Sequence, residues 1–214
     1  WYENDGANDP SFTATDIATS ADYTTAVFVG DLDGDGDLDI VSASYLDDTI
    51  AWYENNGAAD PSFTAENIVT NADGANDIFL VDLDGDGDMD IISASELDDT
   101  IAWYENNGAA DPTFTKAVIA TSADNANDVQ VADLDGDGDL DIVSASNADN
   151  TIAWYENNGA ADPSFTAADI FTSASGANDV HLGDMDGDGD LDIVSAAMAA
   201  GASGAATIHW FEND

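Results

Sequence analysis

A nine-residue acidic segment offers the clearest chemistry in this sequence. Residues 31–39 read Asp-Leu-Asp-Gly-Asp-Gly-Asp-Leu-Asp, which places carboxylates at positions 1, 3, 5, 7 and 9. A hard cation such as Ca²⁺ takes about six to eight oxygen ligands, and this spacing can wrap them around one point. Gly34 and Gly36 permit the backbone angles of a tight loop. Leu32 and Leu38 are expected to point away from the ion and anchor the loop in the protein.

The acidic segment occurs four times, at intervals of 51 residues. Without a cation, neighbouring carboxylates about 5 Å apart would repel each other by roughly 3 kcal/mol per pair. We therefore expect one Ca²⁺ in each segment, about four in all. The candidate metal ligands are the five aspartates of each segment: Asp31, Asp33, Asp35, Asp37 and Asp39; Asp82, Asp84, Asp86, Asp88 and Asp90; Asp133, Asp135, Asp137, Asp139 and Asp141; Asp184, Asp186, Asp188, Asp190 and Asp192.

The sequence does not suit an EF-hand, a magnesium site or a cation-free turn as well as it suits a calcium loop of this kind. An EF-hand needs a bidentate Glu at its twelfth position and flanking helices, but that position holds Ser42, Ser93, Ser144 and Ser195, inside expected strands. Magnesium is less suited, because its octahedral shell usually retains waters and substrate phosphates. A solvated acidic turn would account for one Asp-Gly-Asp, but not for five carboxylates repeated four times in register.

The acidic segments belong to a repeat that fills the chain. Trp-Tyr-Glu-Asn begins at residues 1, 52, 103 and 154 and returns as Trp-Phe-Glu-Asn at residue 210. We expect a single domain over residues 1–214, made of units at about 1–51, 52–102, 103–153 and 154–214, with incomplete units at both ends. Each unit shows four short apolar runs separated by Asn-Gly, Asp-Pro and Asp-Gly turns. The first set of expected strands is 27–29, 39–44, 49–54 and 62–68.

Four antiparallel strands in a tandem repeat of this length are typical of the blades of a β-propeller. We therefore expect an all-β fold of propeller-type blades, each with one calcium loop between its first and second strands. The repeated pairs Trp52-Tyr53, Trp103-Tyr104 and Trp154-Tyr155 could stack on sugars. Adjacent strand residues face opposite sides, however, so at least one ring of each pair is expected to pack between blades.

The composition excludes several classes of partner and of chemistry. The 214 residues include 46 Asp or Glu but one Lys or Arg, and the formal net charge is −45. Nucleic acids and anionic membranes are bound through basic residues, and Lys116 stands alone. No apolar run is long enough to insert into a membrane. The sequence contains no cysteine and no nucleophile-elbow motif around a serine, and neither His181 nor His209 has an equivalent histidine in another unit. The chain is therefore not expected to be an enzyme.

The tandem Asp-x-Asp-Gly-Asp-Gly-Asp-x-Asp motif, followed by Ile-Val-Ser-Ala, resembles the FG-GAP/VCBS repeats over the whole chain. Those repeats form propellers in integrin α-subunits, in some lectins and in many secreted bacterial surface proteins. The resemblance implies that positions 1, 3, 5 and 9 bind calcium through their side chains and position 7 through its carbonyl. Integrin-type propellers have seven blades, whereas this chain carries four repeats.

These observations predict a non-catalytic, extracellular or cell-surface calcium-binding propeller that acts as a structural or adhesive module. Extracellular modules bind calcium weakly, with dissociation constants of about 10⁻⁴–10⁻³ M, which suits calcium-rich fluids. The partner is expected to be another protein, a second copy of the chain or a glycan. The alternatives are a calcium-dependent glycan-binding lectin and a non-catalytic accessory domain of a larger secreted enzyme.

The ends of the chain and its variable connections bear on assembly and binding. The sequence starts within a motif, without an initiator Met, as a mature or truncated protein would, and it finishes on a third strand, residues 207–213. A four-bladed ring, a fragment of a larger ring, and strand sharing between copies in dimers or filaments all fit these ends. The units differ most at residues 23–25 and 198–206, in connections expected opposite the acidic loops, where binding sites usually lie.

Overall fold

The computed structural model describes residues 1–198 and 206–213. These residues form strands and no helix, so the all-β expectation is confirmed for them. None of the described segments is a helix suited to crossing a membrane. The strands are β1 (Tyr2–Asn4), β2 (Phe12–Ala14), β3 (Thr24–Gly30), β4 (Asp39–Ser44), β5 (Thr49–Asn55), β6 (Phe63–Val69), β7 (Ala75–Val81), β8 (Asp90–Ser95), β9 (Thr100–Asn106), β10 (Phe114–Ala120), β11 (Ala126–Ala132), β12 (Asp141–Ser146), β13 (Thr151–Asn157), β14 (Phe165–Phe171), β15 (Ala177–Gly183), β16 (Asp192–Ala197) and β17 (Thr207–Phe211).

Consecutive strands pair with one another to form small antiparallel sheets. The first sheet is β3-β4-β5-β6, the second β7-β8-β9-β10 and the third β11-β12-β13-β14. The last sheet holds three strands, β15-β16-β17, and β1 and β2 form a separate N-terminal hairpin. The expected four-stranded repeat is thus confirmed, and its first strand is longer than the sequence indicated, since β3 covers 24–30 rather than 27–29.

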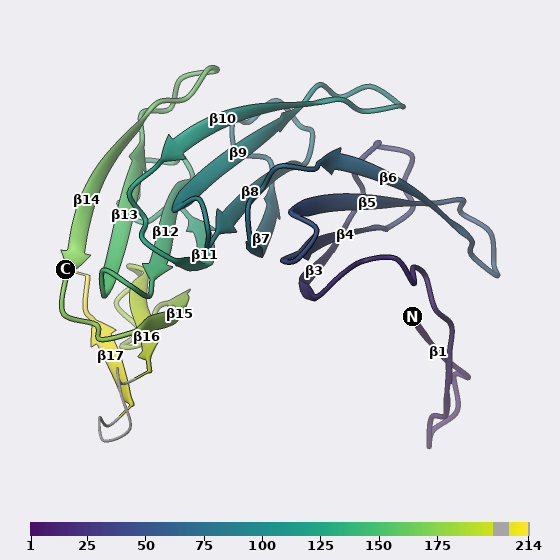
Figure 1. Ribbon diagram of the computed structural model, residues 1–214, viewed down its shortest axis with the longest axis horizontal. Helices are drawn as coiled ribbons and strands as arrows, with labels where there is room; N and C mark the ends of the chain where they lie inside the picture. Colours follow the sequence, from purple (N-terminus) through teal and green to yellow (C-terminus); the bar gives the residue numbers. More distant parts are fainter. Residues whose placement is uncertain (199–205, 214) are drawn as a thin grey trace.

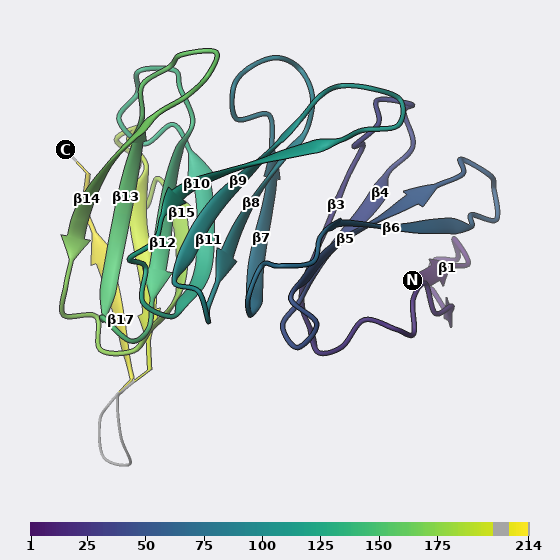
Figure 2. The same ribbon diagram turned by 45° about the horizontal axis from the view of Figure 1, so that its top comes forward.

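The four sheets stand side by side in an open arc (Figure 1). Their first strands, β3, β7, β11 and β15, lie on the inner side of the arc, and each contacts the next. The two termini lie at opposite ends of the arc in both views (Figures 1 and 2). The described residues therefore arrange blade-like sheets around one side of an axis without closing a ring.

Three apolar clusters fill the spaces between neighbouring sheets. Trp52 and Trp103 are each 2 % exposed, and Tyr104 is 1 % exposed. Both members of a Trp-Tyr pair are therefore core residues, one on each face of its sheet, because successive side chains alternate across a strand. In the first two interfaces the tryptophans are not available to stack on sugars.

Polar side chains on the inner strands tie one sheet to the next. The Thr25 hydroxyl donates to the Ala75 carbonyl at 2.9 Å. The Asn76 amide donates to the side-chain oxygen of Asn127 at 2.8 Å and to its carbonyl at 3.1 Å. These bonds join the first sheet to the second and the second to the third, so the arc is held by directional contacts as well as by apolar packing.

Two inner-strand carboxyl groups form a buried pair at the centre of the arc. Asp77 accepts a hydrogen bond from the Val129 amide at 3.1 Å, and Asp128 accepts one from the Val180 amide at 2.7 Å. Burial, and then the neighbouring Asp77 carboxyl, raises the pKa of Asp128 to about 9. Burial also raises the pKa of Asp77. The pair therefore keeps a proton at neutral pH, which spares the interface a second buried charge.

The Asp77–Asp128 pair predicts a falling stability with rising pH. An unfolded Asp releases its proton at about pH 3.9, whereas the folded chain keeps the Asp128 proton up to about pH 9. Between these values the unfolded state binds fewer protons, so the free energy of unfolding decreases as pH rises. Asp128→Asn keeps an acceptor for Val180 and should stabilise the chain by at least about 1 kcal/mol at pH 8, and by less at pH 5.

Thermal or urea melts at both pH values measure this effect. The matched control is Asp179→Asn, because Asp179 occupies the same position on β15 but its side chain is 48 % exposed. The Asp179 charge adds only a minor repulsion to those that raise the pKa of Asp77 and Asp128, so the control should change the pH dependence much less than Asp128→Asn does. Equal effects of the Asp128 and Asp179 substitutions would contradict a proton-sharing pair.

Candidate metal-binding loops

The four acidic segments form the connections from the first to the second strand of each sheet, β3–β4, β7–β8, β11–β12 and β15–β16. Gly34 and Gly36 have φ values of +72° and +96°, and the equivalent glycines of the other loops are also positive. Nothing lies within 4 Å of a side chain built at either position, so the backbone angle alone requires glycine. The expectation of glycine-permitted loop angles is confirmed.

Each acidic loop is held by hydrogen bonds from its own backbone to its own carboxylates. In the first loop the Gly36 amide donates to Asp31 Oδ2 at 3.0 Å, and the Asp35 amide donates to Asp33 Oδ1 at 3.2 Å. The Asp37 amide donates to Asp35 Oδ1 at 2.8 Å. The aspartates at positions 1, 3 and 5 thus each use one oxygen to shape the loop and leave the other oxygen free of these bonds.

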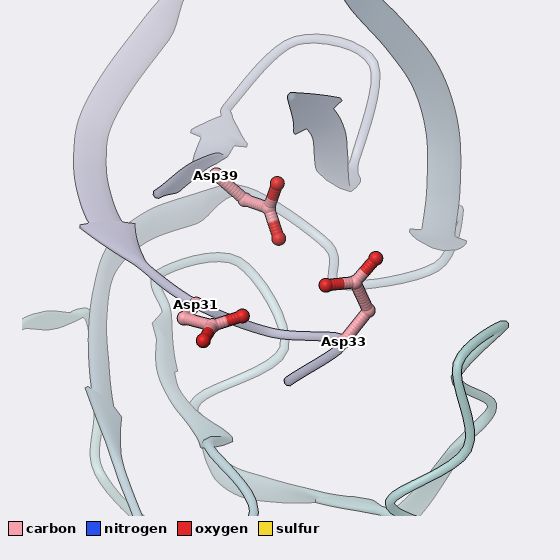
Figure 3. A group of neighbouring side chains, drawn as sticks. All are labelled: Asp31, Asp33 and Asp39. Carbon is pink, nitrogen blue, oxygen red and sulfur yellow. The ribbon is translucent and has the colours of Figure 1, made fainter. Parts of the chain in front are cut away.

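The carboxylates of each loop converge on one point. Figure 3 shows Asp31, Asp33 and Asp39 approaching a common space from three sides. In every loop, one oxygen from each of three aspartates lies within 4.8 Å of the others, close enough for a shared metal ion. These groups are Asp31, Asp33 and Asp39; Asp82, Asp84 and Asp86; Asp133, Asp135 and Asp137; Asp184, Asp186 and Asp188.

The carboxylate at position 9 is the most deeply placed in each loop. Asp39 accepts from the Leu32 amide at 3.1 Å and from the Asn55 amide at 2.8 Å, which ties the loop to the end of β5. Burial raises the pKa of its counterpart Asp90 to about 7. Burial, followed by the surrounding carboxylates, also raises the pKa of Asp33. Negative charge on Asp33 and Asp90 is therefore disfavoured when no cation is near. The fourth loop differs, because a hydrogen bond from the Asn213 amide lowers the pKa of Asp192.

Three of the loops contain a buried oxygen without a hydrogen-bond partner. It is Oδ1 of the position-1 aspartate in each case: Asp31, Asp82 and Asp133. A buried carboxylate oxygen without a donor is destabilising unless something else satisfies it. One divalent cation at the point of convergence of each loop would supply the missing partner of that loop's oxygen. The residues present therefore fit such an ion.

The fourth loop differs from the other three. Both oxygens of Asp184 accept backbone hydrogen bonds, from Gly187 at 2.6 Å and from Gly189 at 3.2 Å. Its three grouped aspartates are all exposed. The fourth loop can still hold a metal ion, but it lacks the buried, unpaired oxygen of the first three loops.

The aspartate at position 7 belongs to none of the four groups. The Asp37 carboxylate lies against Gly57, where an added Cβ would collide with it, and Asp88 and Asp139 lie in the same way against Gly108 and Gly159. This leaves the backbone carbonyl of position 7 as the ligand that the resemblance to known repeats implies. Metal binding by any of the twenty aspartates stays a prediction.

The expected anchoring by the two leucines of the first loop is half correct. Leu32 is 2 % exposed and packs in the first cluster, but Leu38 is 60 % exposed. At the equivalent position, Met89, Leu140 and Leu191 pack against the cluster formed with the preceding sheet. Position 8 therefore anchors the last three loops to the preceding sheet, whereas the first sheet follows only the β1–β2 hairpin and its Leu38 stays exposed.

An asparagine that sequence analysis did not single out links neighbouring loops. The backbone amide of Asn106 donates to Asp90 at 2.8 Å. Its side-chain amide donates to the carbonyl of Met89 in its own loop at 3.0 Å and to that of Leu32 in the preceding loop at 2.9 Å. Asn213 makes the corresponding bond to Leu134 at 2.9 Å. The available signal was the Asn that closes every Trp-Tyr-Glu-Asn motif.

Comparison with known families agrees with the repeat pattern. The FG-GAP-like repeat matches four overlapping segments, residues 1–42, 31–93, 82–144 and 133–195, which together contain all four acidic loops. No curated protein matched the chain.

The asparagine link predicts that Asn106→Ala destabilises the fold by about 1–3 kcal/mol, because the carbonyls of Leu32 and Met89 lose a buried donor. The matched control is Asn55→Ala, since Asn55 bonds in this way only to Leu38 of its own loop at 3.0 Å, in an exposed position. Urea denaturation measures both changes. Equal losses in the two variants would contradict a link between loops.

Proposed function

The chain belongs to the FG-GAP-like repeat family, and we propose that it is a non-catalytic, calcium-binding repeat scaffold that works outside the cell by binding other proteins or further copies of itself. The observation that carries this proposal is the buried, unpaired Oδ1 of Asp31, Asp82 and Asp133 at the centre of converging carboxylates. This arrangement fits a cation-binding loop better than a solvated acidic turn.

The donor set favours calcium over other cations. The side chains of each loop offer only oxygen ligands, which suit hard cations, and no acidic loop contains a histidine or cysteine that would favour zinc or copper. Ca²⁺ accepts many oxygens in irregular geometry, whereas Mg²⁺ requires a near-ideal octahedron and usually retains waters. When bound, calcium supplies positive charge that offsets the repulsion among the loop carboxylates.

The chain's own residues connect the loops to the scaffold. Position 9 of each loop accepts hydrogen bonds from the end of the third strand, and Asn106 extends this contact to the preceding loop. A cation that rigidifies one loop therefore also stabilises the interface between two sheets. We propose that this interface geometry continues into a propeller-type ring, in agreement with the radial order of the inner strands.

The same proposal includes an extracellular or cell-surface location. FG-GAP repeats are typical of extracellular proteins, and weak loop affinities of about 10⁻⁴–10⁻³ M suit calcium-rich fluids. The net charge of −45 argues against nucleic-acid and anionic-membrane partners. The dense carboxylate groups are accounted for by the loops, which is why we propose no catalytic role.

A pocket at the other end of the sheets favours a second candidate function, calcium-dependent glycan binding. The pocket has a volume of about 420 Å³, and Tyr23, Tyr45, Asn76, Glu96 and Asn127 are among its lining residues. The two tyrosine rings meet edge to face with centroids 5.8 Å apart. Aromatic faces beside amide and carboxylate groups are suited to a sugar ring, which presents both apolar C–H surfaces and hydroxyls.

Tyr23 is held in a strained backbone conformation at this pocket. Its φ is +61°, a left-handed value that is unusual for a bulky residue. The other units place Gly74, Asn125 and Gly176 at this position, residue types that adopt such angles more readily. Backbone strain of this kind is found most often at binding sites. Among the four units, the first is the one with a bulky residue at this left-handed position. The connection at residues 199–205, also expected on this face, lies outside the described residues.

Calcium binding predicts a large dependence of stability on the metal. At a concentration of 100 times the dissociation constant, each site adds about 2.7 kcal/mol to the free energy of unfolding. The melting temperature should therefore fall sharply when EGTA replaces millimolar calcium. An unchanged melting temperature would remove the structural role of calcium.

Variants within one loop test the ligand assignment. Asp84→Asn removes a carboxylate of the converging group and should reduce the number of calcium ions bound, as measured by isothermal titration calorimetry. Asp88→Asn is the matched control, because the Asp88 side chain lies against Gly108 instead of in the group. The control should bind calcium as the original chain does.

Glycan binding predicts opposite effects of Tyr23→Gly on stability and binding. The substitution relieves a left-handed backbone, so the melting temperature should not fall, and it removes a pocket wall, so the calcium-dependent signal on a glycan array should disappear. Asn150→Gly relieves a similar left-handed angle (φ +62°) at a residue that does not line the pocket and should keep the signal. An array without any calcium-dependent signal for the original chain would eliminate this candidate.

A further inference from the structure

Each of the first two interfaces between sheets is closed by a phenylalanine from the following sheet. Phe114, at the start of β10, packs against the cluster that contains Trp52. Phe165, at the start of β14, packs in the same way against the cluster that contains Trp103. Both tryptophans are fully buried as a result. The fourth strand of a sheet therefore covers the tryptophan of the sheet before it.

The third interface, between the sheet β11-β12-β13-β14 and the sheet β15-β16-β17, is lined by equivalent apolar residues but lacks this phenylalanine. A pocket of about 200 Å³ lies there, and Trp154, Ile170, Ile193 and Phe211 are among its lining residues. Trp154 is only partly buried, unlike its two counterparts. In the described residues the last sheet stops at its third strand, β17, so no fourth strand fills the position that β10 and β14 fill elsewhere.

One phenylalanine at the start of a fourth strand of the repeat is largely exposed. Phe12, in β2, is equivalent to Phe114 and Phe165 by the 51-residue spacing, and it is 58 % exposed. It sits in the N-terminal hairpin, whose two strands share three residue pairs and are exposed throughout. Its strands pair only with each other, and its closest approach to the first sheet is a pocket that Trp1 and Thr15 line together with Val27. A two-stranded hairpin is marginally stable in water, so β2 can exchange its partner.

We propose that β2 of a second copy pairs with the outer edge of β17 and inserts Phe12 into the pocket beside Trp154. The contact completes the last sheet in the way that β10 and β14 complete theirs. It rests on the self-assembly part of the proposed function and names the surface and the segment that carry it.

The register of the complete sheets fixes how the two strands meet. In the first sheet Asn55 lies opposite Phe63 and Ala51 opposite Asn67. Transferred to the last sheet, this register places Asn213 opposite Phe12 and His209 opposite Asp16. Directly opposite residues share one face of a sheet, so Phe12 faces the same side as Phe211, which lines the pocket. His209 and Asp16 add a favourable cross-strand pair.

The docking strand uses the edge of β2 that now faces β1. Asn4 lies opposite Phe12 in the hairpin, just as Asn55 lies opposite Phe63 in a complete sheet. The motif of β17 therefore replaces the equivalent motif of β1, one Trp-aromatic-Glu-Asn strand for another. The exchange removes three exposed residue pairs and buries an aromatic ring and a strand edge.

A second copy is favoured over the chain's own hairpin by their positions. The N-terminal hairpin and β17 lie at opposite ends of the open arc in both views (Figures 1 and 2). A neighbouring copy brings its β2 to this edge by opening its hairpin, and the arc of neither copy has to change. Such a contact is head to tail, so it closes as a ring of copies or extends as a filament.

The test is complementation between two variants of the full 214-residue chain, followed by sedimentation velocity over a range of concentrations in calcium. Phe12→Ala removes the inserted ring and keeps the pocket, whereas Ile170→Asp spoils the pocket and keeps the ring. We expect the original chain to associate with increasing concentration and each variant alone to be monomeric. An equimolar mixture should form a 1:1 heterodimer and nothing larger.

A control and a calcium titration separate this proposal from the proposed function. Leu46→Ala removes an apolar side chain that is also exposed, at 60 %, but lies away from β2 and should associate like the original chain. Calcium binding to the Phe12→Ala variant should match the original chain, so loss of association without loss of calcium supports the docking site. An original chain that stays monomeric, an associated Phe12→Ala variant, or a mixture without heterodimer would overturn the proposal, whether or not calcium binds.

Discussion

The concentration of carboxylates at one end of the sheets is the physical constraint on which the rest of this structure depends. Four loops each bring aspartate oxygens within 4.8 Å of one another. Glycine at positive φ and amide bonds from the loop itself hold them there, although like charges at this separation repel. We propose that a bound cation offsets this repulsion.

The loops are also joints between sheets. Position 2 packs in the core in the first three loops, and position 8 packs toward the preceding sheet in the last three. Asn106 bonds to two loops at once. On the opposite end the residues differ among units, with strained Tyr23 as the clearest case. The repeat thus separates two tasks: shared residues build and hold the interfaces, and unshared residues shape the surface available to partners.

Local features of this fold could be predicted from the sequence, whereas contacts between sheets could not. Strand β4, the positive φ of Gly34 and Gly36 and the four-stranded unit follow from period, spacing and residue type within one repeat. The exposure of Leu38, the Asn106 link and the Asp77–Asp128 pair depend on which sheet lies beside which. The convergence of Asp31, Asp33 and Asp39 was predictable because one short loop contains all three.

Anomalous diffraction from crystals grown in millimolar calcium shows directly whether the loops hold this ion. We expect an anomalous peak in each of the four loops, with carboxylate oxygens of positions 1 and 3 about 2.3–2.6 Å from it. First three loops without a peak, despite their buried unpaired oxygens, would rule out calcium as their occupant.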